Sequence, residues 1–338
     1  MSAARQPKIQ GMERSPASTL RIPFTPPYDW EGVHAYLAAR AIPGVEAAGP
    51  GRYARTIALG GRPGLLQVVR GEDASVLLSL DRPEAMPEAA ARIARVFDLA
   101  ADPAAIGAAL SADPFMAGLV AARPGIRVPG AWDGFELAVR AVLGQQVSVA
   151  AATRLAGKLV AAFGQPLAPE APARGAGLSH VFPSPEALVE ADIALALNMP
   201  RARGAAIRAL AAAVIAEPDL FAPGQGLAAS VARLKALRGI GDWTAQYIAM
   251  RALRAADALP TGDLGLLRAL EDAAGRPSAK ALEARSAAWS PWRAYAVLHL
   301  WAHDAARLAA DPGKAATKRI AEQAAGCGPG GAGAKVAP

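Results

Sequence analysis

Leu234-Lys-Ala-Leu237-Arg-Gly239-Ile240-Gly241-Asp-Trp243-Thr244-Ala245 is the stretch of this 338-residue chain that decides its fold. Apolar residues at helical spacing on both sides of the glycines predict two helices joined by a very short turn. Glycine takes a positive φ at no steric cost, so glycines at 239 and 241 would let the chain reverse within a few residues. The residues expected to lock the two helices together are Leu234, Leu237, Ile240, Ala245 and Ile248.

The predicted turn is suited to binding a phosphate. The second helix begins at Asp242, so its first N–H groups and its dipole point towards the turn, where glycine leaves the backbone bare. A Gly-x-Gly alone also marks ordinary turns, but the flanking helices and the small Thr-Ala pair favour a helix–hairpin–helix. Such a motif contacts DNA backbone without reading sequence. We expect Gly239, Ile240, Gly241 and Thr244 to make these contacts and Asp242, as a helix-capping residue, to weaken them.

The composition bounds the class of protein. Hydrophobic residues make up 53% of the chain and the formal net charge is +7. A basic balance favours a polyanionic partner, but on charge alone a generic Arg-rich enzyme is slightly favoured. Cys327 is the one cysteine, which excludes a disulfide framework and a cysteine-ligated zinc or iron–sulfur site. The sequence has neither an apolar run of membrane-spanning length nor a signal-peptide core, so we expect a cytoplasmic, nucleoid-associated protein.

The chain divides into an α+β part and a helical part. Short β-type runs at 52–59, 65–70 and 75–80 lie between predicted helices at 29–40 and 87–97. We therefore predict a small antiparallel-sheet N-terminal domain followed by an all-α helix–hairpin–helix body. Further helices are predicted from Asp133, then through Leu155 to Phe163 and, after a loop at 164–185, over 186–197, 203–216, 227–237, 242–254, 264–274 and 291–308. The predicted organisation is 1–18 disordered, 19–107 α+β domain, 108–132 with 251–310 as one helical subdomain, 133–250 as the subdomain with the hairpin, and 311–338 a disordered tail.

Two aromatic residues follow the turn on one helical face. Trp243 and Tyr247 are four residues apart, so their rings are neighbours. Core packing is the usual role of such a pair. In a chain with only 5% aromatic residues, a wall on which a flipped base stacks is a fair alternative, because enzymes that act on a duplex base hold it between π-faces.

Asp263 follows a Pro/Gly loop in Leu259-Pro-Thr-Gly-Asp263-Leu. Taken alone it is the N-cap of the next helix. The loop, however, returns the chain from the hairpin's second helix towards the mouth of the turn, where a target nucleotide would lie. Asp263 is therefore also a candidate catalytic carboxylate.

Together these residues resemble the helix–hairpin–helix/Gly-Pro-Asp superfamily of base-excision DNA glycosylases, and more narrowly the DNA-3-methyladenine glycosylase II family. The resemblance runs from about residue 20 to 310, and the order of its segments is specific. They are Pro26-Pro-Tyr-Asp-Trp30, Leu37-Ala-Ala-Arg-Ala41, Tyr53-Ala-Arg55, Phe97-Asp-Leu99, Arg123-Pro-Gly125, Leu143-Gly-Gln-Gln-Val-Ser148, Phe182-Pro-Ser-Pro185 and Trp292-Arg-Ala-Tyr-Ala296.

The resemblance implies roles for individual residues. Asp263 would be the catalytic carboxylate, and Trp243, Tyr247, Trp301 and Tyr36 would line the base pocket. Gln145 and Gln146 would fill the gap left by the flipped nucleotide. The family's best-known type has Leu at the position of Gln146 and Tyr at that of Ala302, so this chain has a polar wedge and a roomier pocket.

The implied activity is that of a monofunctional DNA N-glycosylase that excises alkylated bases of the 3-methyl and 7-methyl purine type from duplex DNA. Bifunctional members carry a Lys nucleophile where this chain has Trp243, so we expect no AP-lyase activity. We expect a monomer without metal or cofactor, and leave open a monovalent cation at the hairpin carbonyls. Two alternatives stay open: a non-catalytic helix–hairpin–helix DNA-binding protein, and a glycosylase for an oxidised or deaminated base.

Two further motifs receive plainer interpretations. His299 and His303 lie four residues apart on one predicted helix, a spacing that can bind zinc, but the sequence offers no third ligand. We expect both to be structural or exposed. Arg201-Ala-Arg203-Gly204 fits a phosphate contact at a helix start and a solvated turn equally well.

Overall fold

The computed structural model describes residues 18–168, 177–222 and 224–311. Apart from Ser18 and Asp311, the segments expected to be disordered lie outside the described residues. Ser18 itself begins a strand, one residue before the predicted start of the α+β domain.

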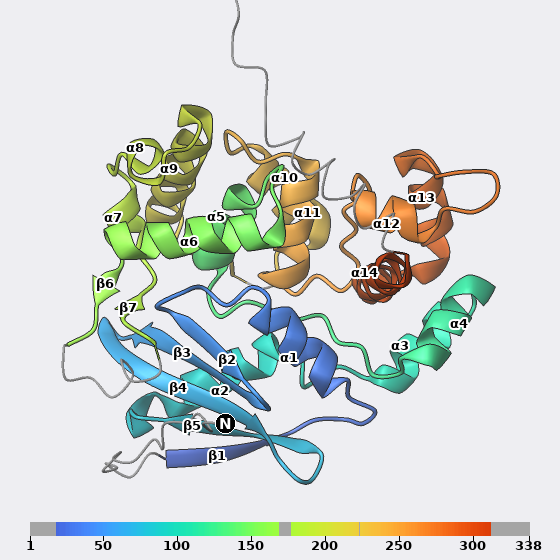
Figure 1. Cartoon of the computed structure of the whole chain (residues 1–338), viewed down its shortest axis with the longest axis horizontal. Coiled ribbons are helices and arrows are strands. Elements are labelled where there is room, and N and C mark those ends of the chain that lie inside the picture. Colours follow the sequence, from blue (N-terminus) through green and yellow to red (C-terminus); the bar gives the residue numbers. More distant parts are fainter. Residues whose placement is uncertain (1–17, 169–176, 223, 312–338) are drawn as a thin grey trace, which may run out of the picture.

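The N-terminal part is built on a five-stranded antiparallel sheet (Figure 1). Its strands run in the order β1 (Ser18–Pro23), β5 (Ser75–Leu80), β4 (Arg62–Arg70), β3 (Arg52–Leu59) and β2 (Glu46–Gly49). The three predicted runs are β3, β4 and β5. The edge strands β1 and β2 were not predicted, because the first is largely exposed and the second, Glu-Ala-Ala-Gly, has no β-branched residue.

Two helices cover this sheet. α1 (Trp30–Ala38) and α2 (Met86–Val96) contribute to a core in which Trp30 stacks on Phe97 with ring centroids 5.5 Å apart. α1 begins where the Asp29 carboxylate accepts the Gly32 N–H at 2.9 Å. The helix directs Val33 and Leu37 into the sheet core but Tyr36 against the core of the helical body. α1 thereby carries an aromatic residue of the N-terminal part to the other side of the junction.

The remainder is a helical body, as predicted. The expected 186–197 helix is two helices, because the Asp192 side chain accepts the Leu195 N–H at 3.1 Å and starts a new one. Two short strands, β6 (Gln165–Pro166) and β7 (His180–Val181), interrupt the predicted loop. The helices are α3 (Pro103–Leu110), α4 (Pro114–Ala122), α5 (Gly134–Leu143), α6 (Val149–Phe163), α7 (Pro185–Leu188), α8 (Ile193–Leu197), α9 (Arg201–Ala216), α10 (Leu227–Lys235), α11 (Asp242–Arg251), α12 (Leu264–Ala269), α13 (Ala279–Ser286) and α14 (Arg293–Ala310).

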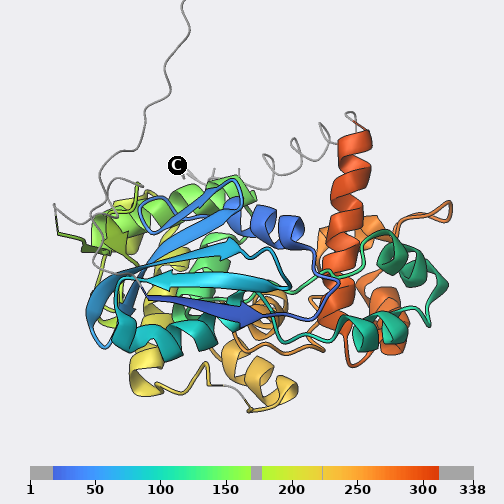
Figure 2. The same ribbon diagram turned by 90° about the horizontal axis from the view of Figure 1, so that it is seen from below.

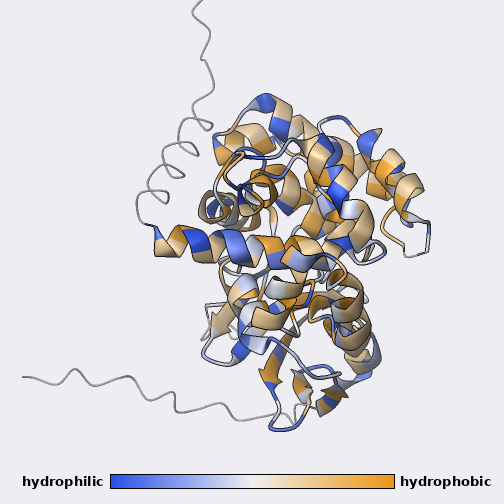
Figure 3. Cartoon of the chain, turned by 90° about the vertical axis from the view of Figure 1, so that its right-hand side faces the viewer, coloured by the Kyte–Doolittle hydropathy of each residue, from blue (hydrophilic) through white to orange (hydrophobic). Residues whose placement is uncertain are grey.

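α5 lies at the centre of the body, and eight of its ten residues are buried. It contacts both α9 and the hairpin helix α11. On the other side α12 packs on α14, where the Arg268 guanidinium donates to both Asp304 carboxylate oxygens at 3.0 and 2.6 Å. α14 then runs past the rest of the body, so that its C-terminal half projects from the molecule (Figures 2 and 3). Along that half, polar and apolar turns alternate in Figure 3.

None of the helices in the described ranges is long and apolar enough to cross a membrane.

The two histidines of α14 have packing roles. His299 is buried, and burial together with nearby Arg123 lowers its pKa to about 4. The His303 ring meets the Phe115 ring edge-on at 5.6 Å. Among the described residues, no group of three His, Cys, Asp or Glu side chains is placed to hold a metal ion.

Candidate active site

The predicted hairpin is present between α10 and α11. Leu234, Ile240, Ala245 and Ile248 are buried and Leu237 is partly buried. Gly239 has a φ of +85°, and a Cβ there would lie 2.6 Å from the Cβ of Ala206, so position 239 requires glycine.

Gly241 differs from the expectation that both glycines adopt positive φ. Its φ is −85° and a Cβ there would meet open space. It is the exposed N-cap of α11, and it offers no side chain to the first N–H groups of that helix. Asp242 is the first residue of the helix rather than its cap, and it accepts a hydrogen bond from Lys235 Nζ at 2.9 Å. The helix N-terminus therefore stays open to an external anion.

The two glutamines after α5 are placed differently. Gln145 Nε2 donates to the Gly239 carbonyl at 2.9 Å and to Thr244 Oγ1 at 3.1 Å, so its side chain braces the hairpin. Gln146 is exposed and has a φ of +58°. Arg203 Nη2 donates to the Gln145 carbonyl at 2.8 Å and supports this segment. The side chain of Arg203 is therefore bonded within the protein, which differs from the solvated turn that was one of its two interpretations.

Asp263 lies beside the hairpin helix, bonded to two tryptophans. Trp243 Nε1 donates to Oδ2 at 2.9 Å and Trp301 Nε1 donates to Oδ1 at 3.0 Å. Oδ1 also accepts the Leu266 N–H at 3.0 Å, so Asp263 is the N-cap of α12 as well. The two sequence-based interpretations are therefore compatible. The loop before Asp263 is tied to α11, because the Leu259 N–H donates to Gln246 Oε1 at 3.1 Å.

The aromatic residues predicted for the base pocket lie together at this carboxylate. Trp243 and Tyr247 stack with ring centroids 5.2 Å apart and planes inclined by 8°. The Tyr247 ring is 6.4 Å from that of Trp301, and its hydroxyl is 3.3 Å from that of Tyr36. Residues from α1, α11 and α14 thus form one half-buried aromatic wall next to Asp263.

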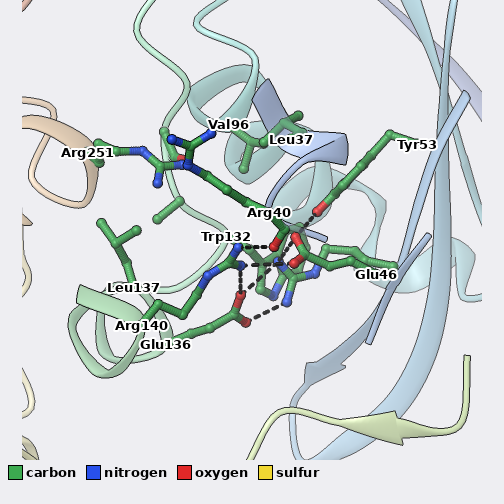
Figure 4. Close-up of a pocket in the computed structure, with 13 residues that line it drawn as sticks. Leu37, Arg40, Glu46, Tyr53, Val96, Trp132, Glu136, Leu137, Arg140 and Arg251 are labelled. Atoms are coloured by element: carbon green, nitrogen blue, oxygen red, sulfur yellow. Dashed lines mark hydrogen bonds and ion pairs between the residues drawn. The ribbon is translucent and has the colours of Figure 1, made fainter. Parts of the chain in front are cut away.

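Two arginines behind the wall were not predicted. Arg251 donates to the Tyr247 hydroxyl at 2.7 Å, and the Arg40 guanidinium lies 3.7 Å from the centre of the Tyr36 ring. Both also line the small polar cavity drawn in Figure 4. Each arginine follows its tyrosine by four residues, Arg251 within α11 and Arg40 just past the end of α1, and this spacing is a signal that could have identified them.

Gly265, two residues after Asp263, leaves room for this arrangement. A Cβ at position 265 would lie 3.0 Å from Asp263 Oδ1 and 3.3 Å from Trp301 Cδ1. Gly265→Ala should therefore shift the carboxylate and the indole by a few tenths of an ångström. For the base release that the resemblance implies, small misplacements of reacting groups are costly, so we expect about tenfold slower release with unchanged or higher thermal stability, as alanine favours a helix.

Gly118→Ala is the matched control for this prediction. Gly118 lies inside α4, and a Cβ there would have no neighbour within 4 Å. Single-turnover kinetics and thermal unfolding of both variants separate the two effects. Equal rates for Gly265→Ala and the wild type would contradict the positioning role of Gly265.

Comparison with known proteins places this geometry in a family. Residues 19–133 match the family model of the AlkA N-terminal domain, and residues 139–294 match that of the HhH-GPD superfamily base excision DNA repair proteins. The chain is 35% identical to DNA-3-methyladenine glycosylase 2 of Escherichia coli over 82% of its own length and 95% of that protein. The chain belongs to the HhH-GPD superfamily of base excision DNA repair proteins and, within it, to the DNA-3-methyladenine glycosylase 2 family.

A second relative is longer than this chain. The probable bifunctional transcriptional activator/DNA repair enzyme AlkA of Mycobacterium tuberculosis is 43% identical over 284 residues, which cover 84% of this chain and 56% of the relative. The chain therefore spans little more than half the length of that protein.

Solved structures share the fold. The 3-methyladenine DNA glycosylase of Archaeoglobus fulgidus superposes with a TM-score of 0.74 at 21% identity, covering 84% of this chain and 98% of that one. The 8-oxoguanine glycosylase/lyase of Clostridium acetobutylicum, solved with double-stranded DNA, gives a TM-score of 0.62 at 16% identity, covering 79% of this chain and 89% of that one. Glycosylases for different damaged bases thus share this architecture.

Proposed function

We propose that this chain is a monofunctional DNA glycosylase that removes alkylated purines from double-stranded DNA. The observation that carries the proposal is the Asp263 carboxylate, fixed by the indoles of Trp243 and Trp301 beside the stacked aromatic wall and the open start of α11. A protein that only binds DNA backbone needs the hairpin but neither the carboxylate nor the wall.

The chemistry of alkylated purines fits a single carboxylate. A purine alkylated at N3 or N7 carries a positive charge and is already a good leaving group, so it needs little protonation. As its C1′–N bond breaks, the electron pair leaves with the base and positive charge grows on the deoxyribose. A negative Asp263 beside C1′ would stabilise that charge and orient or deprotonate the water that completes the hydrolysis. Stacking of the cationic base on electron-rich rings favours it over a normal base.

Trp243 supports the absence of lyase activity. Bifunctional members of the superfamily have a Lys at this position, which forms a Schiff base with the sugar. An indole cannot form one, and here it is engaged in holding Asp263. The lyase relatives of the same fold, by this reasoning, differ in the nucleophile and not in the scaffold.

The proposed reaction needs no cofactor. A monovalent cation at the hairpin carbonyls stays a prediction; of these carbonyls, that of Gly239 accepts a hydrogen bond from the Gln145 amide. We propose that the protein acts as a monomer on DNA in the cytoplasm. The exposed hairpin and Gln146, which faces solvent, are the groups that would meet the duplex.

The test is base release from methylated duplex DNA. We expect the purified protein to release methylated purines, to leave undamaged DNA intact, and to produce nicks only after alkali or heat has cleaved the abasic sites. No release of any methylated base would refute the glycosylase proposal, and nicking without such treatment would refute the monofunctional one. A duplex with 8-oxoguanine, the substrate class of the oxidised-base alternative, should yield no product.

A further inference from the structure

Arg251 is fixed from three sides at the back of the base pocket. Its Nε donates to the Pro129 carbonyl and its Nη2 to the Gly130 carbonyl, both at 2.8 Å, while Nη1 donates to the Tyr247 hydroxyl at 2.7 Å. Arg251 is only 4% exposed. Because the two carbonyls hold the guanidinium plane, its charge is directed permanently at the phenol oxygen of Tyr247.

Arg40, just past the end of α1, adds a second positive charge. Its guanidinium lies 3.7 Å from the centre of the Tyr36 ring, and the Arg251 guanidinium lies 4.9 Å from the same ring. Arg140 of α5 donates to the Arg40 carbonyl and anchors this end of α1. Figure 4 shows Arg40 and Arg251 pointing into the same small space.

These charges pose a problem for the proposed substrate. Two guanidinium groups behind the wall should repel a positively charged base, since arginine cannot lose its proton in a protein. The phenol of Tyr247 is the group placed to offset them. Its oxygen receives the Arg251 hydrogen bond and lies within 3.3 Å of the Tyr36 hydroxyl, which can donate a second one.

We propose that Tyr247 determines specificity by ionising in the folded enzyme next to Arg251, so that its phenolate favours positively charged bases over neutral ones. This inference rests on the proposed glycosylase function. The phenol proton passes to solvent, and the phenolate oxygen then accepts hydrogen bonds from Arg251 and Tyr36. Arg251 acts through Tyr247 and is a positioning residue.

The electrostatics of the site agree with this geometry. Burial opposes ionisation of Tyr247, but Arg251 and Arg40 favour it more strongly, and together they lower the pKa of Tyr247 to about 7. Burial raises the pKa of its partner Tyr36, which stays protonated and remains a donor. As the pH rises through this range, the combined charge of the two arginines and Tyr247 falls from two positive charges to one, so a cationic base should bind better.

Other groups that face Tyr247 do not reverse the expected direction, in which a cationic base binds better as the pH rises. Arg140 from α5 also carries a positive charge that acts on Tyr247. Trp301 from α14 and Trp243 from α11 are uncharged, and their indole N–H groups are directed at Asp263.

The first experiment needs no DNA and measures ionisation of tyrosine by near-ultraviolet absorbance as the pH is raised. The absorbance of the wild type should show one step of phenolate formation near neutral pH. Tyr247→Phe should lack this step. In Arg251→Gln and in Arg40→Gln the step should move to higher pH. Tyr295→Phe is the control: this phenol donates to Asp98 at 2.9 Å, and burial raises its pKa, so the neutral step should persist. Arg40→Gln keeps the test valid should Arg251→Gln fail to fold, because Arg40 does not hold the Pro129 and Gly130 carbonyls. A wild type without a step below about pH 9, or a step that survives in Tyr247→Phe, overturns the proposal.

The second experiment compares kcat/KM for duplexes with 3-methyladenine, which stays positively charged in DNA over this pH range, and hypoxanthine, which is neutral. Between about pH 6 and pH 8 the ratio should rise about tenfold for the wild type, the size expected of one charge a few ångströms away, and stay flat for Tyr247→Phe. A flat ratio in a wild type that shows the absorbance step overturns the selective role of the phenolate. If the protein releases neither base, the glycosylase function is refuted, and the selective role of the phenolate with it. The absorbance step then still decides whether Tyr247 ionises.

Discussion

Asp263→Asn is expected to reduce the rate of base release by about two orders of magnitude or more while the protein stays folded. Asparagine caps helices as well as aspartate does, so the Leu266 N–H that now bonds Oδ1 keeps its partner. What disappears is the negative charge. The asparagine amide would also present N–H groups to the Trp243 indole N–H, which now donates to Oδ2, so that one donor would face another.

Single-turnover release of a methylated purine measures this effect, and binding to DNA with an abasic-site analogue separates it from affinity. We expect binding within a few-fold of the wild type. Asp242→Asn is the matched control, because Asp242 is an exposed carboxylate at the hairpin bonded to Lys235. Removing that charge should leave the rate unchanged and strengthen DNA binding slightly. A rate for Asp263→Asn within threefold of the wild type would leave the proposed mechanism without its central group.

Much of this site could be predicted because its signals are local in the sequence. The hairpin is specified by glycines and apolar anchors within fifteen residues, and the stacked pair Trp243 and Tyr247 by their spacing on one helix. The approach of Asp263 to that helix followed from the Pro/Gly loop. These features need only the geometry of one turn and two helices.

The rest depends on contacts between distant segments. Nothing near residue 129 in the sequence indicates that its carbonyl would orient Arg251, 122 residues further on. At position 265 a Cβ would meet not only the nearby Asp263 Oδ1 but also Trp301 Cδ1 at 3.3 Å, a residue from another helix that the local sequence does not indicate. That Gln145 fills the gap left by a flipped nucleotide stays a prediction. The sequence did not indicate that its amide reaches the Gly239 carbonyl, a contact that forms because α5 packs on α11.

Of the two reasons expected for glycine at position 241, a positive φ and a bare backbone, the positive φ is wrong. The turn obtains its positive φ from Gly239 alone. The role left for Gly241 is to keep the start of α11 bare.

The junction between the sheet and the helical body holds a buried group of four charges, which no sequence pattern indicated (Figure 4). Arg55 of β3 donates to Glu136 of α5 at 2.5 Å, and Arg140 of α5 donates to Glu46 of β2 at 2.9 Å and to Glu136 at 3.2 Å. Burial is nearly complete at three of them, with side chains no more than 5% exposed for Glu46, Arg55 and Glu136. The adjoining cavity of about 20 Å³ is large enough for one water molecule.

Glu136→Gln should lower the free energy of unfolding by about 3 kcal/mol or more, because it leaves Arg55 buried without its closest carboxylate. Glu88→Gln is the control. Glu88 is bonded to Arg92 at 2.7 Å, but its side chain is 53% exposed, so its loss should cost at most about 1 kcal/mol. Chemical denaturation of both variants gives the comparison.

The double variant Arg55→Met with Glu136→Met distinguishes a missing partner from a missing interaction. It removes one positive and one negative charge and leaves Arg140 paired with Glu46 at 2.9 Å. Since a buried ion pair offsets little more than the cost of desolvating its own charges, two apolar side chains of similar length should restore most of the lost stability. If the double variant is as unstable as Glu136→Gln, the pair itself holds the sheet against α5. If Glu136→Gln unfolds at the same denaturant concentration as Glu88→Gln, the buried Arg55 does not need the Glu136 carboxylate as its partner, and the prediction is wrong.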